Sequence, residues 1–150
     1  MTLKTLPLKQ LDATLAPWRT VRSPPPVGGW IHAVRQALGM TARQLAKSVG
    51  VTQPAVADAE RTEARGDITL KTLRRYAAAL DCELVYALVP LKSLESTVDA
   101  RAERIARDQI ARVRHSMQLE QQGTSDELLD HQVEDLKRKL LEGRRSRLWL

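Results

Sequence analysis

The sequence predicts a mostly helical protein in which a helix-turn-helix unit precedes one short β-strand and a C-terminal helical hairpin. Three patterns support this fold class. Residues 41–60 hold two short apolar helical periods separated by a glycine, and residues 82–89 are rich in β-formers. Two longer apolar periods follow. We therefore expect three regions: an N-terminal helix with a proline-rich linker (1–27), a helix-turn-helix domain with a terminal strand (28–90), and a hairpin (91–150).

Composition limits the classes of protein to consider. The chain has 150 residues, enough for one domain or one small domain with an extension, and its formal net charge of +6 suits a polyanionic partner. Cys82 is the single cysteine, so no intrachain disulfide can form. No apolar run could span a membrane, and Lys9, Gln10 and Asp12 interrupt any signal-peptide core. We expect a cytoplasmic protein.

The first region predicts a short helix and a stiff linker. Leu8, Leu11 and Leu15 repeat at helical spacing after Pro7, and residues 23–26 read Ser-Pro-Pro-Pro. A helix this short is marginal in isolation. We therefore expect it to dock on its own core or on a second subunit.

Two helices joined by a tight turn form the centre of the second region. Leu45 and Ala46 give the first helix an apolar face, and Gly50 permits the left-handed conformation that ends it. Thr52 is a suitable N-cap for the second helix, and Pro54 fits its first turn. This joint spacing favours a DNA-binding motif over an ordinary helical hairpin. Apolar stripes predict two further helices. The first, at residues 29–38, carries the stripe Trp30, Ile31, Val34 and Leu38. The second, at 69–80, follows a turn at Gly66, begins with Thr69 as its cap and carries the stripe Leu70, Leu73, Tyr76, Ala77 and Leu80.

Two blocks of the sequence resemble known families. GGWIHAVRQALGMTARQLAKSVGVTQPAVADAE (28–60) is similar to the Xre/Cro-type helix-turn-helix of phage repressors. DITLKTLRRYAAALDCELVYALVP (67–90), with KQLDATLAP (9–17) upstream, narrows the resemblance to mobile mystery protein A, a bacterial helix-turn-helix family. That resemblance implies a gene pair in mobile elements whose other member is a Fic-domain protein, in a toxin–antitoxin-like arrangement.

The second motif helix supplies the candidate base contacts. In such folds its N-terminal residues enter the major groove, which places Gln53 first, because glutamine can bond adenine N6 and N7 together. The resemblance adds Pro54, Ala57 and Asp58. Pro54 has no side-chain donor, Ala57 can touch a thymine methyl, and Asp58 can accept from cytosine N4 or repel phosphates. We therefore expect DNA shape to contribute to specificity.

Polar side chains around the motif are candidates for DNA backbone contacts, with solvated surface charge as the alternative. Ala42 occupies the usual position of a phosphate-bonding glutamine, so Thr41 or Arg43 would substitute for it. The other candidates are Lys47, Thr52, Arg61, Arg65 and Lys71. The family pairs an arginine late in its first helix with a glutamate late in the recognition helix, which assigns Arg35 and Glu60 to a structural salt bridge.

The predicted strand at residues 82–89 includes Leu84, Tyr86 and Leu88. A single strand leaves an unpaired edge, so we expect the same strand of a second subunit to pair with it in a homodimer. The alternatives are a buried helix end and a hairpin with residues 1–6.

The third region predicts a long charged helix over residues 91–121 and a last helix opened by a capping box at Thr124 and Glu127. Gly123 separates them. We expect an antiparallel hairpin that either packs on the DNA-binding domain or serves as a dimer or partner arm. The final RRSRLWL predicts a frayed tail.

The sequence offers little for catalysis. His131 and Glu134 could share one helix face, but a metal site needs a third ligand, so we expect no catalytic, metal or cofactor site and no enzyme. Arg138 also replaces the Ser or Thr that precedes Glu-Gly in some Fic-inhibiting antitoxins. We predict a sequence-specific repressor that binds double-stranded DNA as a dimer and regulates its own operon. The alternative is a protein-binding antitoxin that acts on the Fic partner with little DNA binding of its own.

Overall fold

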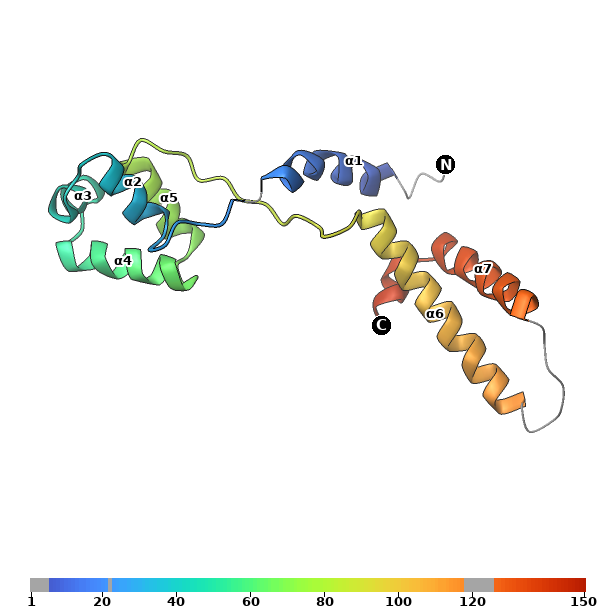
Figure 1. Cartoon of the computed structure of the whole chain (residues 1–150). Coiled ribbons are helices and arrows are strands. Elements are labelled where there is room, and N and C mark those ends of the chain that lie inside the picture. The colour runs from blue at the N-terminus through green and yellow to red at the C-terminus, as the bar shows by residue number, and fades with distance from the viewer. Residues whose placement is uncertain (1–5, 22, 118–125) are drawn as a thin grey trace. The chain divides into compact units, whose positions relative to one another are not determined.

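The computed structural model describes residues 6–21, 23–117 and 126–150. Its helices are α1 (Leu6–Leu15), α2 (Trp30–Ala37), α3 (Ala42–Val49), α4 (Gln53–Arg65), α5 (Leu70–Ala79), α6 (Leu94–Met117) and α7 (Asp126–Glu142) (Figure 1). Short 3₁₀ turns follow α1 and α7, namely η1 (Ala16–Thr20) and η3 (Arg145–Trp149). The mostly helical fold class is confirmed. The chain divides into two compact units, one of Val21–Leu88 and one that joins the residues up to Thr20 with Val89–Leu150.

Helices α2 to α5 enclose the core of the first unit. Its buried side chains are Ile31, Leu45, Ala46, Val56, Ala59, Tyr76 and Leu80. All of them occupy apolar positions of the four helices that periodicity predicts in this region. Three members of the predicted stripes are exposed instead, and each lies at an end of its helix: Leu70 is 40% exposed, Trp30 52% and Leu38 58%.

Local capping residues bound these helices where the sequence predicts. Gly50 (φ 77°) and Gly66 (φ 79°) adopt the left-handed conformation at the C-termini of α3 and α4. The hydroxyl of Thr69 accepts a hydrogen bond from the backbone N–H of Thr72 at the start of α5 (3.1 Å). Thr52 occupies the N-cap of α4 with extended backbone, but its hydroxyl makes no capping hydrogen bond.

The predicted strand at residues 82–89 is absent from the described chain, where these residues form no regular element. Leu88 is 90% exposed, and Tyr86 is 60% exposed with the guanidinium of Arg74 lying 5.7 Å from its ring centre. Leu84 is partly buried. A β-forming composition is not enough to form a strand within one subunit, because a strand also needs a neighbouring strand to bond, and the described residues supply none. Residues 1–6, one suggested partner, lie almost wholly outside the described residues.

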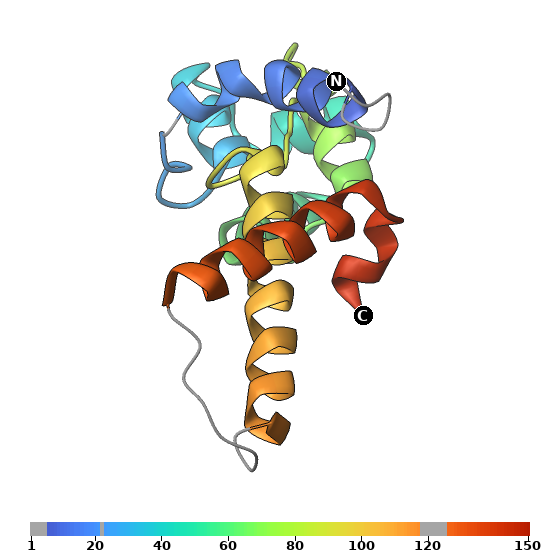
Figure 2. The same cartoon turned by 90° about the vertical axis from the view of Figure 1, so that its right-hand side faces the viewer.

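Helices α6 and α7 pack against each other in the second unit, and Figures 1 and 2 show α7 lying obliquely across α6. Two interhelical ion pairs, Lys137 with Asp99 (2.9 Å) and Arg107 with Asp130 (3.8 Å), follow opposite orders along the two helices, as an antiparallel arrangement requires. The buried side chains of the pair are Ala102, Ala106 and Val133. Small alanines one turn apart allow close approach of the helices. Residues 118–125, with the predicted Gly123 and Thr124 signals, lie outside the described residues.

Helix α1 docks on α6 through a side-chain cap. The two carboxylate oxygens of Asp12 accept hydrogen bonds from the backbone N–H groups of Leu94 (2.7 Å) and Glu95 (3.1 Å), in the first turn of α6. Lys9 of α1 also lies 3.7 Å from the carboxylate of Glu95. The short N-terminal helix therefore docks on a core of its own chain, one of the two outcomes expected for it.

The prediction of a frayed C-terminal tail is wrong. Leu148 of η3 is fully buried, and its carbonyl oxygen accepts a hydrogen bond from Arg101 Nε of α6 (2.6 Å). The same guanidinium lies 5.8 Å from the ring centre of Trp149. Burial of Leu148 and the contacts of Arg101 therefore hold this basic segment against the helices. Every helix among the described residues is too short or too polar to span a membrane.

Candidate nucleic-acid interface

Helices α3 and α4 form the motif, and a capping box fixes the start of the first. The Thr41 hydroxyl accepts from the backbone N–H of Gln44 (3.2 Å), while Gln44 Oε1 accepts from the backbone N–H of Thr41 (2.8 Å). At the other end of α3, Arg75 of α5 donates to the carbonyl oxygen of Val49 (3.1 Å). Both ends of α3 are therefore held by side chains, which limits fraying of this helix.

Close packing sets the angle between the two motif helices. Leu45 and Val56 are fully buried, and Ala46 and Ala59 are 4% and 6% exposed. Alanine at these positions leaves room for α3 and α4 to approach. The Tyr76 hydroxyl donates to the carbonyl oxygen of Ala55 (3.3 Å), which ties α4 to α5. The orientation of α4 thus depends on the core rather than on the turn alone.

Arg35 and Glu60 lie together beneath the motif. Arg35 Nε and Nη2 donate to the two carboxylate oxygens of Glu60 at 2.6 and 3.1 Å, and both side chains are 13% exposed. His32 Nδ1 lies 2.9 Å from the same carboxylate, and Arg35 Nη1 donates to the carbonyl oxygen of Met40 (3.0 Å). The hydrogen bond to Glu60 raises the pKa of Arg35 despite its burial. This bidentate pair joins α2 to α4.

A second carboxylate on α4, which sequence reasoning did not identify, caps α2. Glu63 Oε1 and Oε2 accept hydrogen bonds from the backbone N–H groups of Trp30 (2.8 Å) and Ile31 (2.9 Å). Gly29 precedes them with φ 88°, and a Cβ there would lie 2.8 Å from Glu63 Oε2. The signal in the sequence is indirect: a helix that begins after glycine lacks its own capping side chain, so the cap must come from elsewhere.

The four candidate base contacts, Gln53, Pro54, Ala57 and Asp58, are all exposed on the N-terminal half of α4. They form two neighbouring pairs at i, i+4 spacing on one helix face. Asp58 is engaged with Arg61, whose Nη2 donates to its carboxylate at 2.8 Å. That pairing reduces the repulsion that an isolated aspartate would exert on phosphates.

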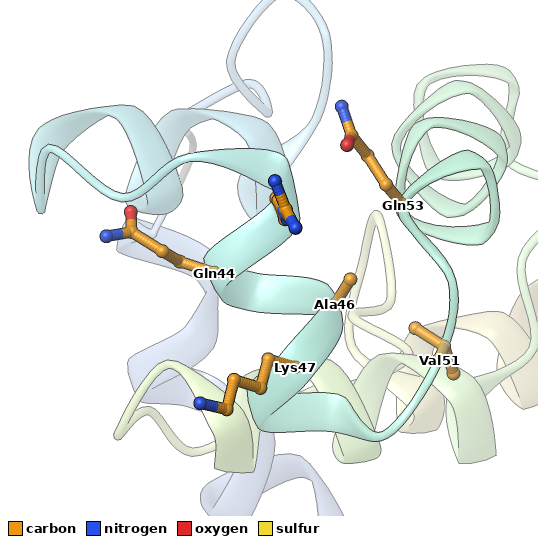
Figure 3. A pocket seen from close by; sticks show the side chains of 6 residues that line it. Gln44, Ala46, Lys47, Val51 and Gln53 are labelled. Atoms are coloured by element: carbon orange, nitrogen blue, oxygen red, sulfur yellow. The ribbon is translucent and has the colours of Figure 1, made fainter.

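An open hollow of about 510 Å³ lies between α3 and the start of α4. Its lining residues are Arg43, Gln44, Ala46, Lys47, Val51 and Gln53. Figure 3 shows Gln44 and Lys47 extending from α3 and Gln53 from the first turn of α4. The fold therefore brings Gln53 into one surface with two of the candidate backbone contacts, Arg43 and Lys47.

The candidate backbone contacts differ in what already engages them. All seven are exposed: Thr41, Arg43, Lys47, Thr52, Arg61, Arg65 and Lys71. Thr41 takes part in the capping box, Arg61 pairs with Asp58, and the Arg65 guanidinium lies 3.5 Å from Asp67. Arg43, Lys47 and Lys71 form no ion pair with the described residues. These three cations keep their charge available to an external anion.

Metal ligands do not cluster in the described ranges, where no three His, Cys, Asp or Glu side chains gather closely enough to hold an ion. His131 and Glu134, the weak candidate pair, are both exposed on α7. The Glu134 carboxylate lies 3.7 Å from Lys137 Nζ, and this ammonium group would compete with a metal ion for the carboxylate.

Residues 31–86 match the family described as helix-turn-helix. No curated protein and no solved structure gives a significant match to the chain. The matched region runs from the second residue of α2 through α5 and includes the buried core that orients α4. Residues 31–86 are therefore an Xre-type helix-turn-helix domain, which indicates a DNA-binding transcription regulator.

Proposed function

We propose that this protein is a sequence-specific repressor that places α4 in the major groove of double-stranded DNA. The observation that carries the proposal is the exposed N-terminal face of α4, where Gln53 shares an open surface with Arg43 and Lys47. A polar side chain that can bond a base lies there beside cations that can bond phosphates.

Gln53 is the principal base contact in this proposal, because its amide can bond an adenine edge through two hydrogen bonds. Ala57, one turn later on the same face, offers an apolar contact to a thymine methyl, and Pro54 adds shape alone. Asp58, engaged with Arg61, serves as an acceptor for cytosine N4 when that pair opens. With one strong base contact, sequence-dependent DNA shape supplies part of the specificity.

The proposed DNA backbone contacts fall into two groups, residues without an ion pair in the described chain and arginines that already pair with an aspartate. Arg43, Lys47 and Lys71 bind phosphates directly, and the Thr52 hydroxyl, which makes no cap, donates to a phosphate at the start of α4. Arg61 and Arg65 must weaken their pairs with Asp58 and Asp67 to do the same. Thr41 acts mainly through the capping box that holds α3.

The protein acts as a homodimer in this proposal. Operators with two half-sites require two motifs, and Tyr86 and Leu88 expose apolar surface in a segment that has no strand beside it within the described chain. Leu84, Tyr86 and Leu88 would pair with the same segment of a second copy, which satisfies the backbone groups of both. Gel filtration with light scattering tests this, and Leu88→Lys should shift a dimer toward monomer.

The family resemblance also suggests a genetic context and a partner for the protein. By that resemblance, the protein is the antitoxin-like member of a pair with a Fic-domain protein, encoded on a mobile element and repressing its own operon. It would work in the bacterial cytoplasm, associated with the nucleoid. The matched helix-turn-helix domain supports the regulatory part of this proposal.

Fluorescence anisotropy tests the central proposal, with the duplex upstream of the gene compared with a scrambled duplex across a salt series. Gln53→Ala should reduce discrimination between them by about 1–3 kcal/mol, whereas Lys47→Ala should weaken both alike and lower the salt slope by about 0.9. Gln10→Ala, an exposed glutamine on α1, is the matched control. Equal affinity for both duplexes at about 0.15 M salt would reject sequence-specific binding.

A groove in the second unit favours an additional role as a protein-binding antitoxin or adaptor. Between α6 and α7, an open groove of about 550 Å³ is lined in part by Ile110, Val113 and Leu136, and Val113 is 53% exposed. An apolar helix of the Fic-domain partner is the proposed occupant. Val113→Glu should abolish co-elution with that protein while Ala111→Glu, on the same helix, should not; equal effects would remove the groove from the proposal.

A further inference from the structure

A second basic surface lies outside the motif, at the C-terminal turn. Gly143 to Leu150 contains three arginines and no acidic side chain. We define the arginine patch as Arg144, Arg145 and Arg147. A hollow of about 320 Å³ beside it is lined by Gly143, Arg144, Arg145 and Ser146, so two of the three arginines border one open space.

The arginine patch is held in place rather than carried on a loose tail. Leu148, directly after it, is fully buried, and Arg101 of α6 donates to the Leu148 carbonyl oxygen at 2.6 Å. Arg101 also lies over the ring of Trp149, and the turn η3 packs against α6 and α7 (Figure 1). Because the backbone of this turn is already ordered, binding an anion costs less conformational entropy than it would on a loose tail.

The arginine patch also differs from its neighbours in its charge partners. On α6 and α7, Arg107 pairs with Glu103, Arg138 with Asp135, and Lys137 with Asp99. The three patch arginines form no ion pair within the part of the chain that the structure describes. Three arginines close together in sequence, with no ion pair of their own in the described chain, leave their paired N–H donors available to phosphates.

We propose that the arginine patch binds the phosphate backbone of nucleic acid, giving the protein a second, sequence-independent DNA contact outside the helix-turn-helix domain. This inference rests on the DNA-binding role proposed above. DNA is favoured over other polyanions because the same chain carries a domain for that ligand. The patch would raise affinity for any duplex without changing the preference among sequences, since phosphate contacts carry no base information.

The salt dependence of binding to a scrambled duplex tests the proposal in the full-length chain. Replacing all three patch arginines with alanine should lower the slope of log K against log salt by about 0.9 per phosphate, or about 2.7 in total. The preference for the upstream duplex should stay as in the wild type. The corresponding triple lysine variant keeps the charge and should retain most of the slope.

A second triple variant separates local contact from net charge. Arg104→Ala, Arg112→Ala and Arg114→Ala remove the same charge from α6 at positions that also lack ion pairs within the described chain, and should change the slope by less than about 1. Equal slopes for the two alanine triples would overturn the proposal while leaving the repressor function intact. An unchanged slope with lost binding to phosphatidylglycerol vesicles would assign the patch to a membrane surface instead. Failure of the wild type to bind any duplex would overturn both proposals.

Discussion

Neutralising Glu60 should destabilise the helix-turn-helix domain far more than breaking an exposed ion pair does. Glu60→Gln keeps the side-chain shape but leaves the Arg35 guanidinium, 13% exposed, facing a neutral amide. Two hydrogen bonds from Arg35 and one contact with His32 lose their charged acceptor. Breaking a buried pair costs about 3–5 kcal/mol, and the residual exposure of this pair places the expected cost near the lower end.

Urea unfolding and thermal unfolding measure this loss within the right unit. Trp30 of α2 reports on the helix-turn-helix domain alone when Trp18 and Trp149 are replaced by phenylalanine. A loss of about 3 kcal/mol corresponds to a fall in Tm of roughly 12–24 °C, at 4–8 °C per kcal/mol for a domain this small. Asp67→Asn, which breaks an exposed pair in the same unit, should cost less than about 1 kcal/mol.

A double-mutant cycle with Arg35→Met decides whether the pair itself is responsible. Removing both charges leaves no unpaired ion, so Arg35→Met with Glu60→Gln should cost less than the two single changes together. Effects that add within about 0.5 kcal/mol would refute the reasoning, because independent side chains behave in that way.

Acid should remove the same stabilisation. Burial, the largest influence, raises the pKa of Glu60, but hydrogen bonds and charge from Arg35 and His32 outweigh it and lower the pKa overall. The ionised carboxylate therefore stabilises the fold above its unfolded pKa of about 4.3, and this contribution disappears as the pH falls through the lowered pKa. The stability gap between wild type and Glu60→Gln should narrow below about pH 4. A gap that persists in acid would contradict the assignment.

Three further substitutions test contacts within one unit or the other. Gly29→Ala should cost about 1–3 kcal/mol by thermal unfolding, because φ is 88° and the new Cβ would crowd Glu63; a neutral result would show that the capping carboxylate can move away. Asp12→Ala should cost about 1 kcal/mol and reduce the helical circular dichroism signal, since the α6 cap is lost. Leu148→Ala should cost about 2–5 kcal/mol, measured by urea unfolding, because this side chain is fully buried; less than about 0.5 kcal/mol would mean that η3 contributes little.

Features determined by neighbouring residues could be predicted from the sequence. Gly50, Gly66 and Thr69 end or begin helices through their own conformations or through hydrogen bonds spanning three residues. The apolar spacing likewise identified the inner face of α3, because burial in a helix follows its 3.6-residue period. These features depend only on residues a few positions apart, so the sequence is enough to predict them.

Contacts between distant residues could not be predicted in this way. Glu63 caps α2 from 32 residues away, and Asp12 caps α6 from 82 residues away. A carboxylate in a sequence does not indicate which helix start it will meet, since only the packing decides that. Leu148 shows the same limit. Of the three apolar residues at the end of this segment, Leu148 is the one that is fully buried, and its burial depends on the packing of η3 against α6 and α7.

The strand prediction failed for a related reason. Tyr86 and Leu88 have strand-forming side chains, but pairing is a property of two segments, and composition describes only one. A homodimer would supply the second segment from outside the chain. The apolar surface that this segment exposes in one subunit is therefore the surface that the proposed homodimer would cover.

The two motif helices differ in how many of their cations are already paired with carboxylates. Arg61 on α4 is occupied by Asp58, whereas Arg43 and Lys47 on α3 form no ion pair with the described residues. Phosphate attraction should therefore come first from α3, which lets α4 enter the groove with little net charge of its own. Under the proposed function, base discrimination would then depend on Gln53, which lines the hollow between α3 and α4, and on the sequence-dependent shape of the DNA. Under the proposed function, the protein would gain affinity from these cations and specificity from the Gln53 amide and the shape of its operator.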